Sequence, residues 1–304
     1  MAISRAQLVK ELEPGLNALF GLEYKQYENQ HAEIYTTESS DRAFEEEVML
    51  SGFANANVKV EGSGISYDEA QETYTARYTH DTIALAFSIT EEAIEDNLYD
   101  RLASRYTKAL ARSMSNAKQV KAVTPLIQGL PSTDNFDSGD AVSLFSTNHA
   151  TVSGTAVKNT LTTQADLNET SLEQALIDIA GMTDERGLRV AARGMKMVIP
   201  SANQFNAERL MKSPGRTGTA DNDINAVASM GMVPQGYRVN NFLTDTDSWY
   251  IITDVPNGMK MFQRAALKTA MEGDFDTGNV RYKARERYSF GVSDYRGIFG
   301  VEGA

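Results

Sequence analysis

One amphipathic stretch, residues 90–124, constrains the fold of this chain more than any other feature. Its apolar residues recur every four positions and would lie on one face of an α-helix: Ile94, Leu98, Leu102, Tyr106, Leu110 and Met114. Thr90 is the expected N-cap, and Pro125 is expected to end the helix. At 1.5 Å per residue, about 35 residues form a rod of roughly 50 Å, which exceeds the width of a small domain. We therefore expect this helix to act as a spine for the rest of the fold.

A long β-hairpin is predicted directly before the helix, from about Val48 to Ile89. Polar and apolar residues alternate between 57 and 79, with a turn expected at 68–71, and residues 82–89 form a strand with an apolar face at the base of the hairpin. The tip is polar, rich in tyrosine and interrupted by Gly62-Ser63-Gly64. A two-stranded ribbon is only marginally stable alone in water, so we expect its tip to lie on another subunit. This pattern indicates assembly rather than catalysis.

The composition is that of a soluble globular protein. Hydrophobic residues make up 41% of the 304 residues, which allows a sizeable core in one or two domains. The sequence contains no cysteine, which excludes disulfides and thiolate metal sites and favours folding in a reducing cytoplasm. No apolar run is long enough to span a membrane, and the N-terminal residues lack a signal-peptide pattern. We therefore expect a protein that is made in the cytoplasm and has no membrane partner.

The charge is negative overall and unevenly distributed. A net charge of −12 argues against general nucleic-acid binding, which favours basic surfaces. Acidic residues crowd one early segment: Glu28, Glu33, Glu38, Asp41, Glu45, Glu46 and Glu47. Basic residues crowd the later helix: Arg101, Arg105, Lys108, Arg112, Lys118 and Lys121. Blocks of opposite sign can bridge different copies of one chain, whereas the simpler alternative is that each charge is solvated surface.

The N-terminal segment is predicted to be an arm. Residues Ser4 to Leu12 have the pattern of a short helix, which Pro14-Gly15 is expected to break or restart. From Leu22 to about Glu47 the chain is polar, with scattered aromatic residues and no sustained period. We expect this segment to lie across a neighbouring subunit, with a plain surface loop as the alternative.

The second half of the chain mixes helices and strands. The expected elements are a helix capped by Thr170 or Ser171, a strand at 195–199 ended by Pro200, a helix starting at Ser201, a mobile loop at 213–218, and strands near 237–239 and 249–253. A last strand, 281–290, alternates Tyr282, Ala284, Glu286, Tyr288 and Phe290 with residues that are mostly basic: Arg281, Lys283, Arg285, Arg287 and Ser289. One face of that strand is therefore basic, and the set of elements is that of an α+β fold.

Signals for catalysis are weak. Asp276-Thr277-Gly278 matches the core of the aspartic-protease signature, but it occurs once and lacks the flanking apolar run, so we interpret it as a turn. Asp221-Asn222-Asp223 and Asp245-Thr246-Asp247 could offer oxygens to calcium, yet neither continues into a complete binding loop. The three histidines lack ligand spacing and are interpreted as structural or exposed: His31, His80 and His149. The sequence therefore predicts no catalytic, cofactor-binding or metal-binding residue, and no enzyme.

Three stretches of the chain, taken in order, carry a family resemblance. They are Leu144-Phe145-Ser146-Thr147-Asn148-His149 with Gly154-Thr155 and Asn159, then Met197-Val198-Ile199-Pro200 followed by Ala207-Glu208-Arg209-Leu210-Met211, and last Arg287-Tyr288-Ser289-Phe290-Gly291-Val292 with Arg296-Gly297. Together with the order of the elements, from arm to hairpin, spine helix, mixed domain and closing strand, they resemble the major capsid proteins of tailed bacteriophages. The sequence is most similar to the Mu-like major head subunit group.

The resemblance implies the coat fold that is named for a Hong Kong phage. This fold has an N-terminal arm, an extended loop, a peripheral domain and an axial domain. The implied boundaries are 1–49 for the arm, 50–86 for the extended loop, 87–164 for the peripheral domain with its spine helix at 90–124, 165–250 for the axial domain, and 251–304 for the C-terminal strands that return to the peripheral domain.

The resemblance also implies the function. A protein of this family would be a structural head subunit that self-assembles into the icosahedral shell around the double-stranded DNA of a tailed phage, and it would reside in the virion. Its partners would be further copies in hexamers and pentamers, a separate scaffold protein, a portal and a decoration protein, with the DNA enclosed but not bound specifically. The alternatives are the shell of an encapsulin-like protein nanocompartment and a soluble hydrolase.

Overall fold

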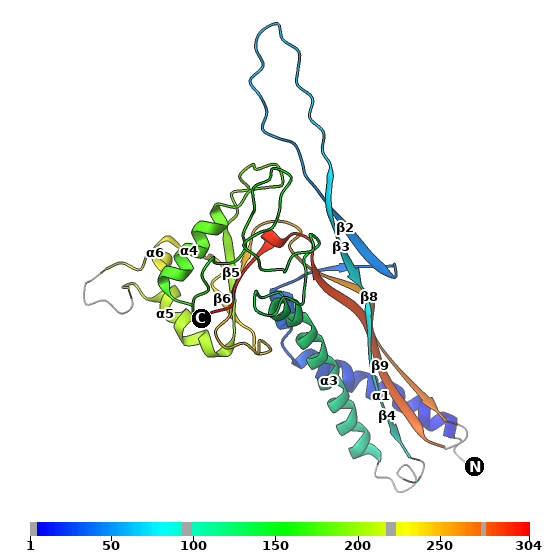
Figure 1. Ribbon diagram of the computed structural model, residues 1–304. Helices are drawn as coiled ribbons and strands as arrows, with labels where there is room; N and C mark the ends of the chain where they lie inside the picture. The colour runs from blue at the N-terminus through cyan, green and yellow to red at the C-terminus, as the bar shows by residue number, and fades with distance from the viewer. Residues whose placement is uncertain (1–4, 91, 93–98, 217–222, 275–277) are drawn as a thin grey trace.

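The computed structural model describes residues 5–90, 92, 99–216, 223–274 and 278–304. The molecule is elongated and has three parts: a long sheet with two helices, a second sheet with its own helices, and a loop that projects away from both (Figure 1). The C-terminus lies in the second part, because the last strand of the chain joins the second sheet.

Two helices pack on one face of the long sheet. Its strand order is β1 (Thr36–Ser39), β8 (Met259–Gly273), β9 (Val280–Val292) and β4 (Asp81–Ile89), with β1 parallel to β8 and the other pairs antiparallel. The helices are α1 (Arg5–Gln26) and α3 (Tyr99–Gln128), which contact each other along the sheet (Figure 1). Phe20 of α1, Met114 of α3 and Tyr282 of β9 are buried in one cluster. This apolar layer holds the helices on the sheet.

The second sheet lies in the larger core. Its strand order is β10 (Ile298–Val301), β7 (Trp249–Thr253), β5 (Gly194–Ile199) and β6 (Tyr237–Val239). The helices of this part are α4 (Glu169–Ala180), α5 (Gln204–Lys212) and α6 (Ala226–Met230). Trp249 and Tyr250 are fully buried, and Leu126 near the end of α3 joins the same cluster. The spine helix therefore connects the two parts through a shared core.

The third sheet is a hairpin that supports the projecting loop. It consists of β2 (Phe44–Leu50) and β3 (Glu72–Thr79), and residues 51–71 between them form the loop at the top of Figure 1. The hairpin rests on the long sheet through Tyr78, whose ring packs edge-on against Phe262 with 4.8 Å between centroids. Gly291 lies beneath the same ring, and a Cβ there would be 2.6 Å from it. This close approach explains the glycine in the closing strand.

The predicted hairpin was wrong in both register and extent. The alternating residues between 57 and 67 are not in strands, and the chain reverses at Glu61-Gly62, where Gly62 has a φ of +83°, instead of at 68–71. The strand at 82–89 exists as β4, but it pairs with β9 and is not the base of the hairpin. Alternation produces a strand only when one face meets a partner, and the loop has no such partner within its own described chain: Val58 is 94% exposed.

Two prolines do not end their helices as predicted. α1 passes through Pro14 to Gln26, and α3 passes through Pro125 to Gln128. An internal proline removes one hydrogen bond and crowds the preceding turn. Burial offsets this cost, because Leu16 is buried just after the first proline and Leu126 just after the second. The expected start of the spine helix, at 91 and 93–98, lies outside the described residues.

Most of the remaining predicted elements are confirmed. β5 ends before Pro200, a 3-10 turn at Ser201–Asn203 leads into α5, and β6, β7 and β9 occupy the expected positions. The cap of α4 differs, since Asn168 is its N-cap and Ser171 completes a capping box as the third residue. The 15-residue strand β8 was not predicted. The loop predicted at 213–218 lies partly outside the described residues.

Candidate assembly interfaces

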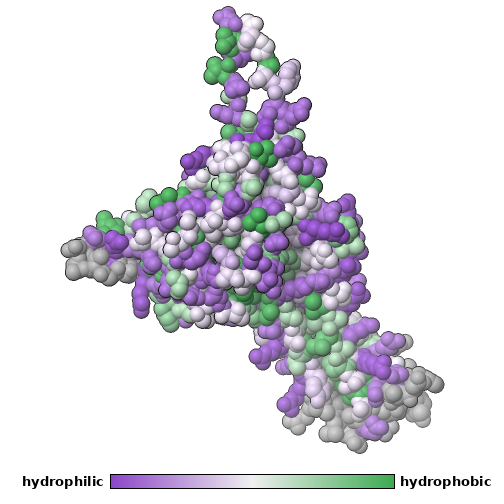
Figure 2. Space-filling view, in the orientation of Figure 1, coloured by the Kyte–Doolittle hydropathy of each residue, from purple (hydrophilic) through white to green (hydrophobic). Residues whose placement is uncertain are grey.

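The projecting loop exposes apolar side chains far from the body of its own subunit. Val58 and Tyr67 are 94% and 96% exposed, and four further large apolar residues of the loop and its base are also exposed: Leu50, Phe53, Val60 and Ile65. Figure 2 shows green, hydrophobic residues among purple and white ones along the projection. Clustered exposed apolar residues are typical of an interaction surface. The loop is therefore the first candidate interface.

The outer face of β9 is a second candidate. Arg281, Lys283 and Arg285 are exposed on this face, opposite the face that packs on the helices. Their cross-strand neighbours on β4 are small: Ser88, Ala86 and Ala84. Arg281 pairs with Asp274, whereas neither Lys283 nor Arg285 forms an ion pair with a described residue. The predicted basic face is thus confirmed at Arg281, Lys283 and Arg285, and no described residue covers this part of it.

The far end of the same face is already covered by the subunit's own hairpin. Lys260 of β8 is 5% exposed and binds the carboxylates of Glu38 and Glu47 at 3.1 and 2.5 Å. The hydroxyl groups of Tyr78 and Ser293 form a hydrogen bond of 2.5 Å. A carboxylate-bearing strand therefore fits this face.

Several charges that we expected to bridge copies are paired inside the subunit. In the acidic segment, Glu33 binds Lys196 at 2.6 Å, and Glu38 and Glu47 bind Lys260 as described above. In the basic helix, Lys118 binds Glu286 at 3.3 Å and Lys121 binds Asp81. These charges already have partners within the subunit, so they lend no support to the bridging interpretation. It remains a prediction for exposed bases of α3 such as Arg112.

A buried ionic cluster ties α3 to β9 beneath α1. Glu286 is 1% exposed, and Lys118, its partner, lies 5.0 Å from the centre of the Tyr288 ring. Burial raises the pKa of the Glu286 carboxyl, and the charge of Lys118 opposes this rise. Breaking such a pair by removing one partner is costly because the other charge stays buried. The cluster therefore fixes the position of the spine helix on the sheet.

His31 beside this cluster makes stability depend on pH. Burial, with the charge of Lys118 nearby, lowers the pKa of His31 to about 4. The unfolded imidazole titrates near 6.5, so between about pH 6.5 and 4 the unfolded state binds the extra proton. Stability should therefore fall as the pH is lowered through this window, by up to roughly 2–3 kcal/mol. Urea unfolding at pH 7 and 4.5 measures the loss.

His31→Gln is the matched variant for this prediction. It removes the titrating ring and leaves the backbone N–H that donates to Gln119 Oε1 at 2.9 Å. The difference in stability between the two pH values should shrink in the variant. An unchanged difference would show that other groups carry the pH dependence.

The first of the three stretches that carry the family resemblance meets the C-terminal turn at Asn159. Its side-chain amide donates to the carbonyls of Leu144 at 2.7 Å and Tyr295 at 3.1 Å, and its Oδ1 accepts from the Ser146 N–H at 2.9 Å. His149 stacks on the Tyr295 ring with 3.9 Å between centroids. Asn159 and His149 are both fully buried. These residues are a structural junction between the loop after α3 and the C-terminal turn.

A second buried junction lies beside it. Arg296 is 3% exposed and pairs with Glu185 and with Asp294, the latter at 3.2 Å. Its Nε donates to the Thr183 carbonyl at 2.9 Å. Glu185 belongs to the turn after α4, so this network fastens the second part of the molecule to the C-terminal turn. The sequence contained no spacing signal for this contact.

His149 Nδ1 lies 2.7 Å from Asp140 Oδ2, and the Ser138 hydroxyl donates to the other oxygen of the same carboxylate. The three histidines are all buried, in separate places, so none of them is exposed. Residues 221, 222, 276 and 277 of the aspartate motifs lie outside the described part. Within that part, no set of three His, Asp or Glu side chains could hold a metal, and no helix is long and apolar enough to cross a membrane.

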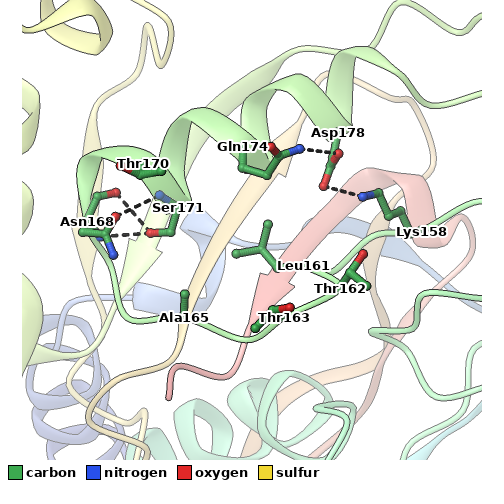
Figure 3. Close-up of a pocket in the computed structure, with 10 residues that line it drawn as sticks. All are labelled: Lys158, Leu161, Thr162, Thr163, Ala165, Asn168, Thr170, Ser171, Gln174 and Asp178. Atoms are coloured by element: carbon green, nitrogen blue, oxygen red, sulfur yellow. Dashed lines mark hydrogen bonds and ion pairs between the residues drawn. The ribbon is translucent and has the colours of Figure 1, made fainter.

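A hollow of about 400 Å³ lies along α4 (Figure 3). Lys158 binds Asp178 at 2.8 Å, and Gln174 donates to the same carboxylate at 3.0 Å. At the other end, the Asn168 side chain accepts from the Ser171 N–H at 2.9 Å in the capping box. These polar groups satisfy one another, so their arrangement stabilises the helix.

Comparisons with known proteins agree with this architecture. The capsid of an empty GTA particle matches with a TM-score of 0.58 at 14% identity, covering 90% of this chain and 89% of that chain. The capsid of Myoviridae phage XM1 matches with a TM-score of 0.55 at 11% identity, covering 89% of both. A virus-like particle from Pyrococcus furiosus matches with a TM-score of 0.51 at 10% identity, covering 94% and 98%. No curated protein matches the chain.

These matches show the Hong Kong-phage-type coat fold, as the sequence predicted. A family model described as phage capsid protein matches residues 73–301, which is most of the chain. The chain therefore belongs to the phage capsid protein family.

Proposed function

We propose that this protein is the major head subunit of a tailed phage, and that it self-assembles into an icosahedral shell around double-stranded DNA. The observation that carries the proposal is the projecting loop, whose apolar side chains are exposed and pack against no described residue of their own subunit. Docking one loop on the next copy is a heterologous contact, which closes into rings when the rotation is right. Many weak contacts of this kind act together in a shell. The role is structural and not enzymatic.

The parts of the subunit receive different roles in this proposal. Residues 1–49 act as an arm and 50–86 as the extended loop. Residues 87–164 and 251–304 form the peripheral domain, and 165–250 form the axial domain around the five- and six-fold axes. The subunits form hexamers and pentamers with the help of a separate scaffold protein, a portal and a decoration protein, and membership of the Mu-like group belongs to the same proposal.

Expression of the chain with its scaffold protein tests the proposal. We expect closed particles of uniform diameter in electron micrographs, and rings or shells in sedimentation profiles. A protein that sediments as a monomer at every concentration, with the scaffold present, would contradict the shell function.

A nanocompartment shell is the second candidate. It is favoured by the match to the virus-like particle, since this chain covers 98% of that protein. The contents of purified particles distinguish the two: nuclease-protected DNA supports the phage head, and a single enclosed protein supports the compartment.

A further inference from the structure

The base of the projecting loop is tied to its own subunit by Asp68. One carboxylate oxygen accepts the Ala54 N–H at 2.7 Å, which joins the two legs of the loop. The other oxygen lies 2.5 Å from Nη2 of Arg186, in the turn that follows α4. The Ala54 amide and the Arg186 guanidinium hold the pKa of Asp68 below its usual value, so the carboxylate is charged at neutral pH.

The turn that carries Arg186 is itself held in place. Asp184 Oδ1 accepts the N–H of Arg186 at 2.9 Å and that of Leu188 at 2.7 Å. Gly187 has a φ of +85°, a left-handed conformation that favours glycine. The adjacent Glu185 is buried and binds Arg296 near the C-terminus. Consecutive residues of one fixed turn therefore bind the C-terminal junction and the loop.

The loop has few other contacts that could set its direction. Near its base, Ser51 donates its N–H to the Gln71 carbonyl at 2.9 Å. Between Asp68 and the tip of the loop, the hydrogen bonds join residues that are close in sequence. One example is the bond from the Ser63 N–H to the Val60 carbonyl at 3.1 Å. A half-exposed ion pair contributes little to the stability of one subunit. The ion pair has a larger effect on the direction of the loop than on the stability of the subunit, because no other contact of the described residues fixes that direction.

We propose that Asp68 and Arg186 are positioning residues, forming a tether that aims residues 55–67 at a second copy before the two subunits meet. This inference rests on the proposed function. A loop that is already aimed loses less conformational freedom when it docks. Because every copy in a shell docks one loop, a small gain per subunit is repeated many times and favours closure of the shell.

Charge reversal tests the tether. Asp68→Arg and Arg186→Asp each break the pair, and the double variant restores it with the charges exchanged; Asp68→Asn is a milder variant on the loop itself. Since the chain has no cysteine, Ser63→Cys gives a unique site for a fluorophore. We expect lower anisotropy of the label and shell formation at least about fivefold slower in each single variant. Recovery in the double variant should be partial, because an arginine side chain at position 68 cannot accept the Ala54 N–H.

Thermal unfolding of every variant checks that the subunit stays folded, and Asp68→Asn decides the matter if Arg186→Asp unfolds. The control is Lys212→Glu, which breaks an exposed ion pair with Glu208 on α5. The control should leave the anisotropy unchanged. Unchanged anisotropy in Asp68→Asn and Asp68→Arg would overturn the tether. If the unaltered chain forms no shell, the proposed function fails, and the anisotropy still decides the tether.

Discussion

Replacing residues 55–67 with a short Gly-Ser linker is expected to abolish shell formation while leaving the subunit folded. The segment is exposed along its length and contributes nothing to the buried clusters. Removing it should therefore change the free energy of unfolding by less than about 1 kcal/mol. The shell loses the contacts that the loop makes with the next copy. Urea unfolding measures the first effect, and sedimentation with electron microscopy measures the second.

The replaced segment must end before β3, so that the subunit stays folded. A larger deletion, 55–80, would remove β3 with the buried Ala76 and Tyr78, and loss of shells would then reflect an unfolded subunit. Tyr67→Ser is a milder companion that keeps the length of the loop and removes its most exposed aromatic ring. Normal shells from the linker variant would refute the role of the loop in assembly.

Gly297→Ala is expected to have the largest effect on folding of any single substitution considered. A Cβ at this position would lie 2.3 Å from the Cα of Gly258 and 3.3 Å from its nitrogen. Both contacts are with backbone, which cannot rotate away as a side chain can. These two backbone segments meet where the 3-10 turn Tyr295–Gly297 passes the start of β8. We expect a loss of at least about 4 kcal/mol, or an insoluble protein.

Gly273→Ala is the matched control for this substitution. Gly273 ends β8, its φ is not in the left-handed region, and no atom lies within 4 Å of the added Cβ. Urea unfolding of both variants and of the unaltered protein gives the comparison. A Gly297→Ala protein as stable as the control would mean that the two turns can separate without cost.

Local patterns predicted the elements that are buried along one face. The period of the spine helix, the strand before Pro200 and the alternation that ends in Phe290 all record which side chains are inside. The same patterns failed where local chemistry and tertiary burial disagree. Pro14 and Pro125 read as breaks, yet the residues beyond them are buried strongly enough to continue the helices. The loop alternates like a strand, but no described strand lies beside it to pair with.

The interfaces divide in a similar way. The basic face of β9 was visible as alternation, because a strand exposes every second residue. The ion pairs within the subunit could not be predicted from the sequence pattern. Glu47 and Lys260, for example, are more than two hundred residues apart. The partners in two further pairs, Asp68 with Arg186 and Glu185 with Arg296, are more than one hundred residues apart. No local period records which of many acids meets which base.

The sequence by itself determined the spine helix, the closing strand with its basic face, and a loop too polar and glycine-rich to build its own core. Only the tertiary structure decided which strands pair, how far the helices run past their prolines, and which charges are used up within the subunit. The physical reason is that periodicity reports whether one face of an element is buried, whereas pairing depends on distances between segments that are remote in the chain.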